Sequence, residues 1–219
     1  MYKSIIFDLD GVLIDSERKS VEDNCDFLIR NGVSEPNLKE VKALIGTTDT
    51  DNVIYMSENL GVSYEEAERI YLEYMEEHPF RGDELVFPEA VPLLSFLKAE
   101  GYILAVVSNS RIEYVEQMLK EGKIRGYFDH VISGRNKNLV KPDPGIYLYA
   151  AEQIGCKPEE CFVIEDSPNG VQAARNAHMK VAGMYSPFLQ LDVTKADYIV
   201  DNLMDVKNLL IGEEKDTND

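Results

Sequence analysis

The sequence has little cysteine and no long apolar run. Its 219 residues include three cysteines, Cys25, Cys156 and Cys161, an odd number without a CxxC pair. This pattern argues against a disulfide framework or a zinc site and fits a reducing cytosol. No apolar stretch approaches the ~20 residues of a membrane helix. Acids interrupt the N-terminal apolar run by Asp8, so we expect no signal peptide, no membrane partner and a cytoplasmic location.

Positive charge is also scarce. The chain has 22 Lys and Arg against 40 Asp and Glu, which gives a formal net charge of −18. A nucleic-acid-binding surface needs basic side chains to neutralise phosphates, so we expect no nucleic-acid partner. An anionic small molecule can still bind where a metal ion or a local lysine reverses the sign of the charge. For the assembly we expect a monomer or a weak homo-oligomer.

The stretch Ser4–Leu13 combines a buried strand with two acids. It begins as the apolar run Ser-Ile-Ile-Phe, which is typical of a strand inside a parallel sheet. Asp8, Asp10 and Gly11 follow at once. Two carboxylates at the end of such a strand are costly unless a cation or hydrogen-bond donors compensate them. The stretch therefore predicts a cation site with a reactive carboxylate.

The segment after this strand reads as consecutive helices. Ser16 is the expected N-cap of the first, and apolar residues at helical spacing continue to about residue 80 without a strand. Ser63 and Glu66 predict a capping box for the fourth helix. Beyond Pro79, strands alternate with helices at βαβ spacing. We therefore predict an α/β fold, with a Rossmann-like doubly wound parallel sheet in residues 1–15 and 82–219 and an inserted four-helix domain in 16–81.

Further strands of this core also end in polar residues. Ser108 and Asn109 follow the strand at Tyr102–Val107, Lys141 lies in the loop after the strand at His130–Ser133, and Glu165 and Asp166 follow the strand at Cys161–Ile164. The carboxyl ends of parallel strands meet at one edge, which is where ligands bind in open α/β sheets.

The residue types at this edge suit phosphoryl chemistry. Several carboxylates without histidine favour a hard cation, best Mg²⁺, over zinc. A metal ion, Lys141 and Ser108 would neutralise and bind a phosphoryl group. One aspartate could then attack phosphorus, while a second could protonate the leaving oxygen and later activate water.

Four segments together resemble the haloacid dehalogenase superfamily of phosphohydrolases. Asp8-Leu9-Asp10-Gly11-Val12-Leu13 resembles motif I, Ser108 motif II, Lys141-Pro142 motif III and Glu165-Asp166-Ser167-Pro168-Asn169-Gly170 motif IV, in the same order over about residues 4 to 185. The inserted helices resemble the cap of the branch related to β-phosphoglucomutase. One motif alone is weak, whereas four in order are specific.

The resemblance implies a role for each matching residue. Asp8 would be the nucleophile and a Mg²⁺ ligand, and Asp10 the general acid and base, with its backbone carbonyl as a further ligand. Ser108 and Asn109 would hold the phosphoryl group, and Lys141 would bridge that group and the nucleophile. Glu165 and Asp166 would complete the metal shell. The implied enzyme is a Mg²⁺-dependent phosphatase of a small phosphorylated metabolite, with sugar phosphates as candidates, working through an aspartyl-phosphate.

The cap departs from the mutases of this branch. Ile45 and Asp49 stand where those mutases carry Lys and Arg, and their cap histidine is absent from residues 17–20. Because a mutase must bind two phosphates, these changes favour hydrolysis. A hexose-phosphate mutase and a non-catalytic phosphometabolite-binding protein remain alternatives. Candidate substrate contacts are Asp15, Lys19, Gly46 and Thr47, each with a hinge, capping or surface role as its alternative.

Overall fold

The computed structural model describes residues 2–216, which divide into two compact units. The first comprises the chain up to Asp15 together with the chain from Arg81 onward, and the second is Ser16–Phe80.

The first unit contains a six-stranded parallel sheet in the order β3-β2-β1-β4-β5-β6. The strands are β1 (Ser4–Phe7), β2 (Ile103–Ser108), β3 (His130–Ser133), β4 (Cys161–Glu165), β5 (Lys180–Met184) and β6 (Tyr198–Val200). Their positions confirm the predicted Rossmann-like doubly wound core. The first strand in the chain thus lies inside the sheet, between β2 and β4, with Phe7 paired to Val106 and to Ile164.

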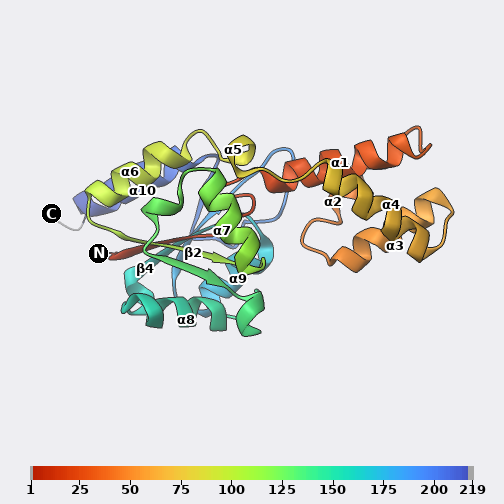
Figure 1. Cartoon of the computed structure of the whole chain (residues 1–219). Helices are drawn as coiled ribbons and strands as arrows, with labels where there is room; N and C mark the ends of the chain where they lie inside the picture. The colour runs from red at the N-terminus through yellow and green to blue at the C-terminus, as the bar shows by residue number, and fades with distance from the viewer. Residues whose placement is uncertain (1, 217–219) are drawn as a thin grey trace. The chain divides into compact units, whose positions relative to one another are not determined.

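Helices cover both faces of this sheet (Figure 1). One face packs against α8 (Gly145–Ile154) and α9 (Pro168–Asn176), and the other against α6 (Ala90–Ala99), α7 (Ile112–Glu121) and α10 (Leu203–Asp216). The remaining short elements of this unit are α5 (Gly82–Leu85), which the sequence patterns did not predict, and the 3₁₀ turns η1 (Arg125–Tyr127), η2 (Arg135–Lys137) and η3 (Pro158–Glu160).

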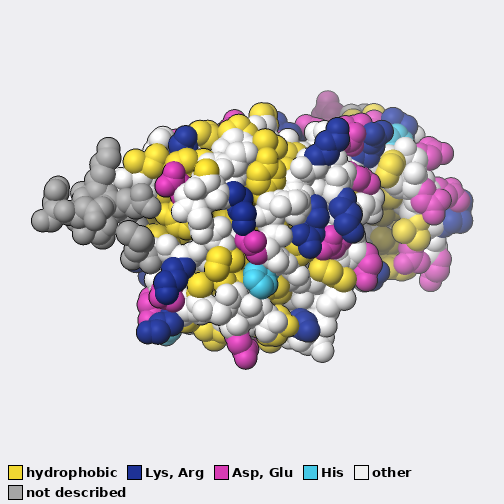
Figure 2. Space-filling model, turned by 60° about the vertical axis from the view of Figure 1, so that its left-hand side comes forward, with side chains coloured by type: hydrophobic (Ala, Val, Ile, Leu, Met, Phe, Trp, Pro, Cys, Tyr) yellow, Lys and Arg dark blue, Asp and Glu magenta, His cyan; other side chains and the backbone are white. Residues whose placement is uncertain are grey.

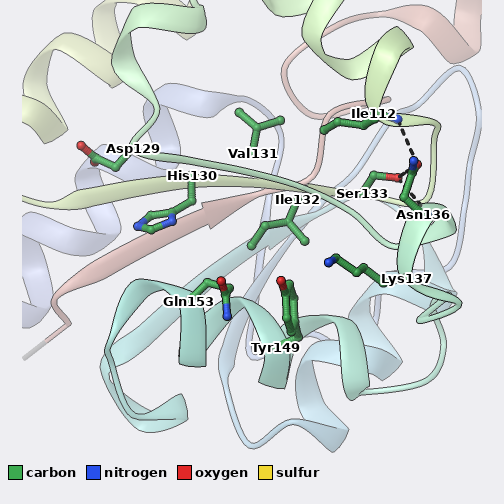
Figure 3. Close-up of a pocket in the computed structure, with 10 residues that line it drawn as sticks. All are labelled: Ile112, Asp129, His130, Val131, Ile132, Ser133, Asn136, Lys137, Tyr149 and Gln153. Carbon is green, nitrogen blue, oxygen red and sulfur yellow. Dashed lines mark hydrogen bonds between the residues drawn. The ribbon is translucent and has the colours of Figure 1, made fainter.

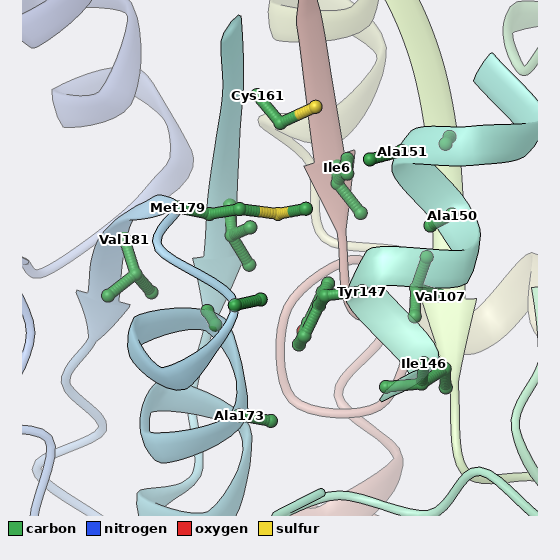
Figure 4. Packing of buried hydrophobic residues seen from close by; sticks show 14 of the residues in the cluster. Ile6, Val107, Ile146, Tyr147, Ala150, Ala151, Cys161, Ala173, Met179 and Val181 are labelled. Carbon is green, nitrogen blue, oxygen red and sulfur yellow. The ribbon is translucent and has the colours of Figure 1, made fainter. Parts of the chain in front are cut away.

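One large cluster of buried apolar residues lies between the sheet and the pair α8 and α9 (Figure 4). Ile6 from β1 and Val163 from β4 are fully buried there, beside Tyr147 and Ala150 of α8 and Ala173 of α9. Strands covered on both faces can be apolar throughout, which explains the unbroken run at the start of the chain. The packed core fixes the ends of the strands, and with them the polar residues that follow.

The second unit consists of α1 (Ser16–Arg30), α2 (Leu38–Lys42), α3 (Asp49–Leu60) and α4 (Tyr64–Glu77). Helix α1 includes Ser16, so the prediction of Ser16 as the residue before the helix was one position late. The predicted capping box at Ser63 forms only in part. Ser63 accepts a hydrogen bond from Glu66 N, but the Glu66 carboxylate pairs with Arg69 instead.

Within residues 2–216, none of the helices combines the length and the apolar character that crossing a membrane requires. Figure 2 shows acidic and basic side chains interspersed on one face of the molecule, so the negative excess is not gathered there into a single patch.

Candidate active site

Asp8 is the first residue after β1 and is buried, with 8% of its surface exposed. Its backbone N–H donates to Ile164 O at 3.0 Å, which extends the pairing with β4 by one residue. Its Oδ1 accepts a hydrogen bond from Leu9 N at 2.8 Å. The chain then turns sharply, and Gly11 adopts a positive φ of 72° that favours glycine. These contacts fix the Asp8 carboxylate at the carboxyl edge of the sheet.

Lys141 connects two of the predicted acids. Its Nζ lies 2.9 Å from Asp8 Oδ1 and 2.6 Å from Glu165 Oε1, and it donates to Val107 O at 3.0 Å. Burial alone would lower the pKa of Lys141, but attraction to Asp8 and Glu165 outweighs it and raises the pKa above the ordinary value. The lysine is therefore a fixed positive charge at this edge.

Glu165 is fully buried and is held by residues to which the sequence analysis gave no role. Tyr147 of α8 donates its hydroxyl to Glu165 Oε1 at 2.5 Å, and Ser167 donates to Oε2 at 3.3 Å. Burial and the Glu165 charge raise the pKa of Tyr147, which keeps this hydroxyl a donor. A Cβ on Gly170 would lie 1.9 Å from the Glu165 carboxyl carbon, so only glycine leaves room for the carboxylate. The sequence offered one signal for this contact. Tyr147 lies in an apolar helix, and a buried tyrosine hydroxyl needs a hydrogen-bond partner.

Ser108 and Asn109 lie at the end of β2, beside the Lys141 loop. Ser108 is buried, and its Oγ accepts a hydrogen bond from Ser110 N at 3.0 Å. A hydroxyl that accepts keeps its own hydrogen to donate. Asn109 Oδ1 accepts from Lys141 N at 3.0 Å and so ties the two loops together. This arrangement can present hydroxyl and N–H donors to an anion.

Three buried carboxylates form a cluster with the composition of a metal site. Ligand oxygens of Asp8, Glu165 and Asp166 all lie within 4.8 Å of one another. Burial and the Glu165 charge raise the pKa of Asp8 well above its ordinary value, although Lys141 opposes the shift. When all three carboxylates are ionised, the one ammonium leaves an excess of two negative charges, which a divalent cation would neutralise. An all-oxygen donor set with this excess fits Mg²⁺.

The Asp10 side chain has different partners from Asp8. Its Oδ2 accepts a hydrogen bond from Ser110 Oγ at 3.0 Å, and its Oδ1 accepts from Tyr114 Oη at 3.2 Å. The carboxylate cluster does not include the Asp10 side chain. The predicted metal contact of Asp10 through its backbone carbonyl stays a prediction. The sequence analysis assigned no role to Ser110 or to Tyr114.

The predicted substrate contacts are divided between the two units. Asp15 lies in the first unit, where its N–H donates to Leu85 O at 2.8 Å. Lys19 lies in the second unit and contacts both carboxylate oxygens of Asp23, at 2.5 and 2.6 Å. Gly46 and Thr47 form a turn in which Thr47 Oγ1 donates to Leu44 O. Their contact with a substrate stays a prediction.

A separate pocket of about 330 Å³ lies along the edge strand β3 (Figure 3). Lys137 and Tyr149 line one side of it, with the lysine Nζ 5.2 Å from the ring centre. None of Asp8, Asp10, Glu165 or Asp166 lines it, so the candidate chemistry and this pocket occupy different places.

Comparison with known proteins identifies a matching family model and several similar proteins. The model of the haloacid dehalogenase-like hydrolase family matches residues 5–184. A phosphoglycolate phosphatase of Nitrosococcus oceani is 30% identical over 217 residues, which cover 94% of this chain and 95% of that protein. A phosphorylated carbohydrates phosphatase of Thermotoga maritima is 26% identical over 186 residues, covering 80% and 81%. The crystal structure of a candidate β-phosphoglucomutase from Thermotoga maritima superposes with a TM-score of 0.79 at 25% identity, covering 97% of this chain and 99% of that one.

Proposed function

The chain belongs to the family of haloacid dehalogenase-like hydrolases, and we propose that it is a Mg²⁺-dependent phosphatase of a small phosphorylated metabolite. The observation that carries the proposal is the contact between the Lys141 ammonium and the buried Asp8 carboxylate, 2.9 Å apart, beside Glu165 and Asp166. The similar proteins named as phosphatases of phosphoglycolate and of phosphorylated carbohydrates support this substrate class.

Asp8 is the proposed nucleophile. Its carboxylate oxygen attacks phosphorus, an aspartyl-phosphate bond forms, and the bond from phosphorus to the leaving oxygen breaks. Asp10 gives its proton to that leaving oxygen. Asp10 then takes a proton from water, the water oxygen attacks phosphorus, and inorganic phosphate leaves while the Asp8 carboxylate is restored.

The other residues bind and neutralise the phosphoryl group. Ser108 donates its hydroxyl to a phosphoryl oxygen, Asn109 keeps the neighbouring loops in register, and Lys141 offsets negative charge. Asp8, Asp166, Glu165 and the Asp10 carbonyl would hold Mg²⁺, which supplies further charge neutralisation when bound. Substrate selection is assigned to Lys19, Gly46 and Thr47 of the unit Ser16–Phe80, together with Asp15, the last residue of the first unit before it.

A screen of phosphate esters tests the proposal. Sugar phosphates, nucleotides and phosphoglycolate are incubated with the protein, with and without Mg²⁺, and released phosphate is measured. We expect Mg²⁺-dependent release that Asp8→Asn abolishes and the exposed control Asp143→Asn retains. The acid-quenched peptide that contains Asp8 should carry a phosphoryl group. Activity retained in Asp8→Asn, or no activity on any ester with metal bound, contradicts the proposal.

The same screen separates hydrolysis from phosphoryl transfer between sugar hydroxyls. Residues 44–49 carry no basic side chain to bind a second phosphate, and Asp49 adds a negative charge at the start of α3. We therefore expect β-glucose 1-phosphate, if it is a substrate, to yield free phosphate. Accumulation of glucose 6-phosphate would instead favour a mutase.

A further inference from the structure

The two oxygens of the Asp10 carboxylate are each held by a different hydroxyl group. Ser110 Oγ lies 3.0 Å from Oδ2 and Tyr114 Oη lies 3.2 Å from Oδ1. Both partners are about 100 residues further along the chain. Asp8 is bound differently, by Lys141 and Leu9 N. The two acids of the same motif are therefore oriented by separate sets of partners.

The two hydroxyls stand on an anchored segment of the chain. Ser110 N donates to Ser108 Oγ at 3.0 Å, and Ser110 O accepts from Ser133 Oγ at 2.7 Å. Ile112, the first residue of α7, donates its N–H to Asn136 Oδ1 at 3.2 Å (Figure 3). Tyr114 lies in the first turn of the same helix. Side chains on anchored elements hold a catalytic group more precisely than those on free loops.

We infer that Ser110 and Tyr114 are positioning residues that aim the Asp10 carboxyl group in both proton transfers. The inference rests on the proposed function, in which Asp10 protonates the leaving oxygen and later takes a proton from water. A hydroxyl can donate to a carboxylate and can also accept from a carboxylic acid. The pair therefore orients Asp10 in either protonation state without itself gaining or losing a proton.

The leaving group of the substrate separates this role from a structural one. An alkyl phosphate ester needs its leaving oxygen protonated, whereas p-nitrophenyl phosphate leaves as a stable anion without that help. For Tyr114→Phe and Ser110→Ala we expect kcat/KM on the alkyl ester to fall by about tenfold to a hundredfold, part of the 10²–10⁴ that acid–base catalysis typically contributes. On p-nitrophenyl phosphate kcat/KM should stay within about twofold. On the alkyl ester kcat should fall while KM and the inhibition constant of vanadate stay unchanged.

Two control variants make the outcome decisive. Tyr127→Phe also removes a tyrosine hydroxyl, whose partner is Ser95, and should not change either rate. Asp10→Asn shows how far kcat/KM falls when the acid–base carboxyl group itself is lost. Suppose that Asp10→Asn is impaired while Tyr114→Phe matches the wild type, or while the kcat/KM of Tyr114→Phe falls equally on both esters. Either result overturns this inference alone. An unimpaired Asp10→Asn overturns the acid–base role in the proposed function and the inference with it.

Discussion

The ammonium group of Lys141 lies 2.9 Å from the carboxylate of Asp8, and both side chains are buried. The same Nζ is 2.6 Å from Glu165, so one cation is shared by two acids in the interior. Buried charges are stable only when they are paired, because removal from water costs each ion several kcal/mol. Stability and proposed activity therefore depend on the same contact.

Replacement of Lys141 by methionine should lower both the stability and the phosphatase activity of the protein. The change leaves two buried carboxylates without their cation, so we expect a loss of about 3–5 kcal/mol in the free energy of unfolding. Phosphatase activity should fall by about 10²–10³, since one charge that stabilises the transition state is gone. Urea unfolding and phosphate release measure the two effects. The exposed Lys195→Met should change neither, and a Lys141→Met variant that behaves like it would contradict this role.

Gly170→Ala tests how closely α9 approaches Glu165. The added Cβ would meet the carboxylate at 1.9–2.0 Å, so Glu165 or the helix must move. We expect a loss of about 1–3 kcal/mol, as is typical of overpacking, together with reduced activity. Gly126→Ala is the matched control, because a Cβ there meets nothing within 4 Å. Equal unfolding free energies for the two variants would argue against the close approach.

The raised pKa of Asp8 predicts a pH dependence of stability in the presence of a chelator. Burial and Glu165 disfavour the ionised form, so folding favours proton uptake between the ordinary aspartate range, about pH 4, and the higher folded pKa. The contribution of Asp8 to stability therefore falls as pH rises through this window. The unfolding free energy of wild type minus that of Asp8→Asn should decrease from pH 4 towards neutrality in urea titrations.

Asp129 provides a control of opposite sign. Burial would raise the pKa of Asp129, but the Leu104 N–H and Lys98 outweigh burial and lower it. Its stabilising contribution is present above the unfolded pKa and is lost as pH falls through the folded pKa. The wild type minus Asp129→Asn difference should therefore increase with pH. If the wild type minus Asp8→Asn difference in unfolding free energy also increased with pH, this result would contradict the excess negative charge at the site.

Mg²⁺ should stabilise the folded protein through the carboxylate cluster. Binding to the native state alone adds about 2.7 kcal/mol at a concentration of 100 Kd, which corresponds to a Tm increase of about 5–10 °C for a chain of this size. Asp166→Asn should reduce this increase, whereas the exposed Glu152→Gln should keep it. Thermal unfolding with EDTA and with rising Mg²⁺ measures the effect. An equal increase in both variants would place the cation elsewhere.

The resemblance recognised from four motifs is confirmed, as are the hydrolase family and the α/β fold. These conclusions could be reached from sequence because each strand end carries its own local signal. Asp8 follows an apolar run, Glu165 and Asp166 follow another, and parallel pairing brings such ends to one edge. The roles of the individual side chains, the Mg²⁺ site and the contacts of Lys19, Gly46 and Thr47 stay predictions.

The local details were harder to predict where two options have similar energies. Ser16 could precede α1 or begin it, since helix starts differ by one residue at little cost. The Glu66 carboxylate could pair with the backbone N–H of Ser63 or with Arg69, and in the structure it pairs with the charged Arg69. The short helix α5 carries too few residues for a periodic pattern.

The sequence by itself determined the family, the alternation of strands and helices, and which polar residues follow which strand. It could do so because hydrophobic periodicity and turn residues act over a few neighbouring positions. Only the tertiary structure decided that Tyr147 holds Glu165, that Gly170 makes room for it, and that Ser110 and Tyr114 hold Asp10. These contacts depend on how α7, α8 and α9 dock on the sheet. Packing of the whole core sets the positions of these helices to within a few tenths of an ångström.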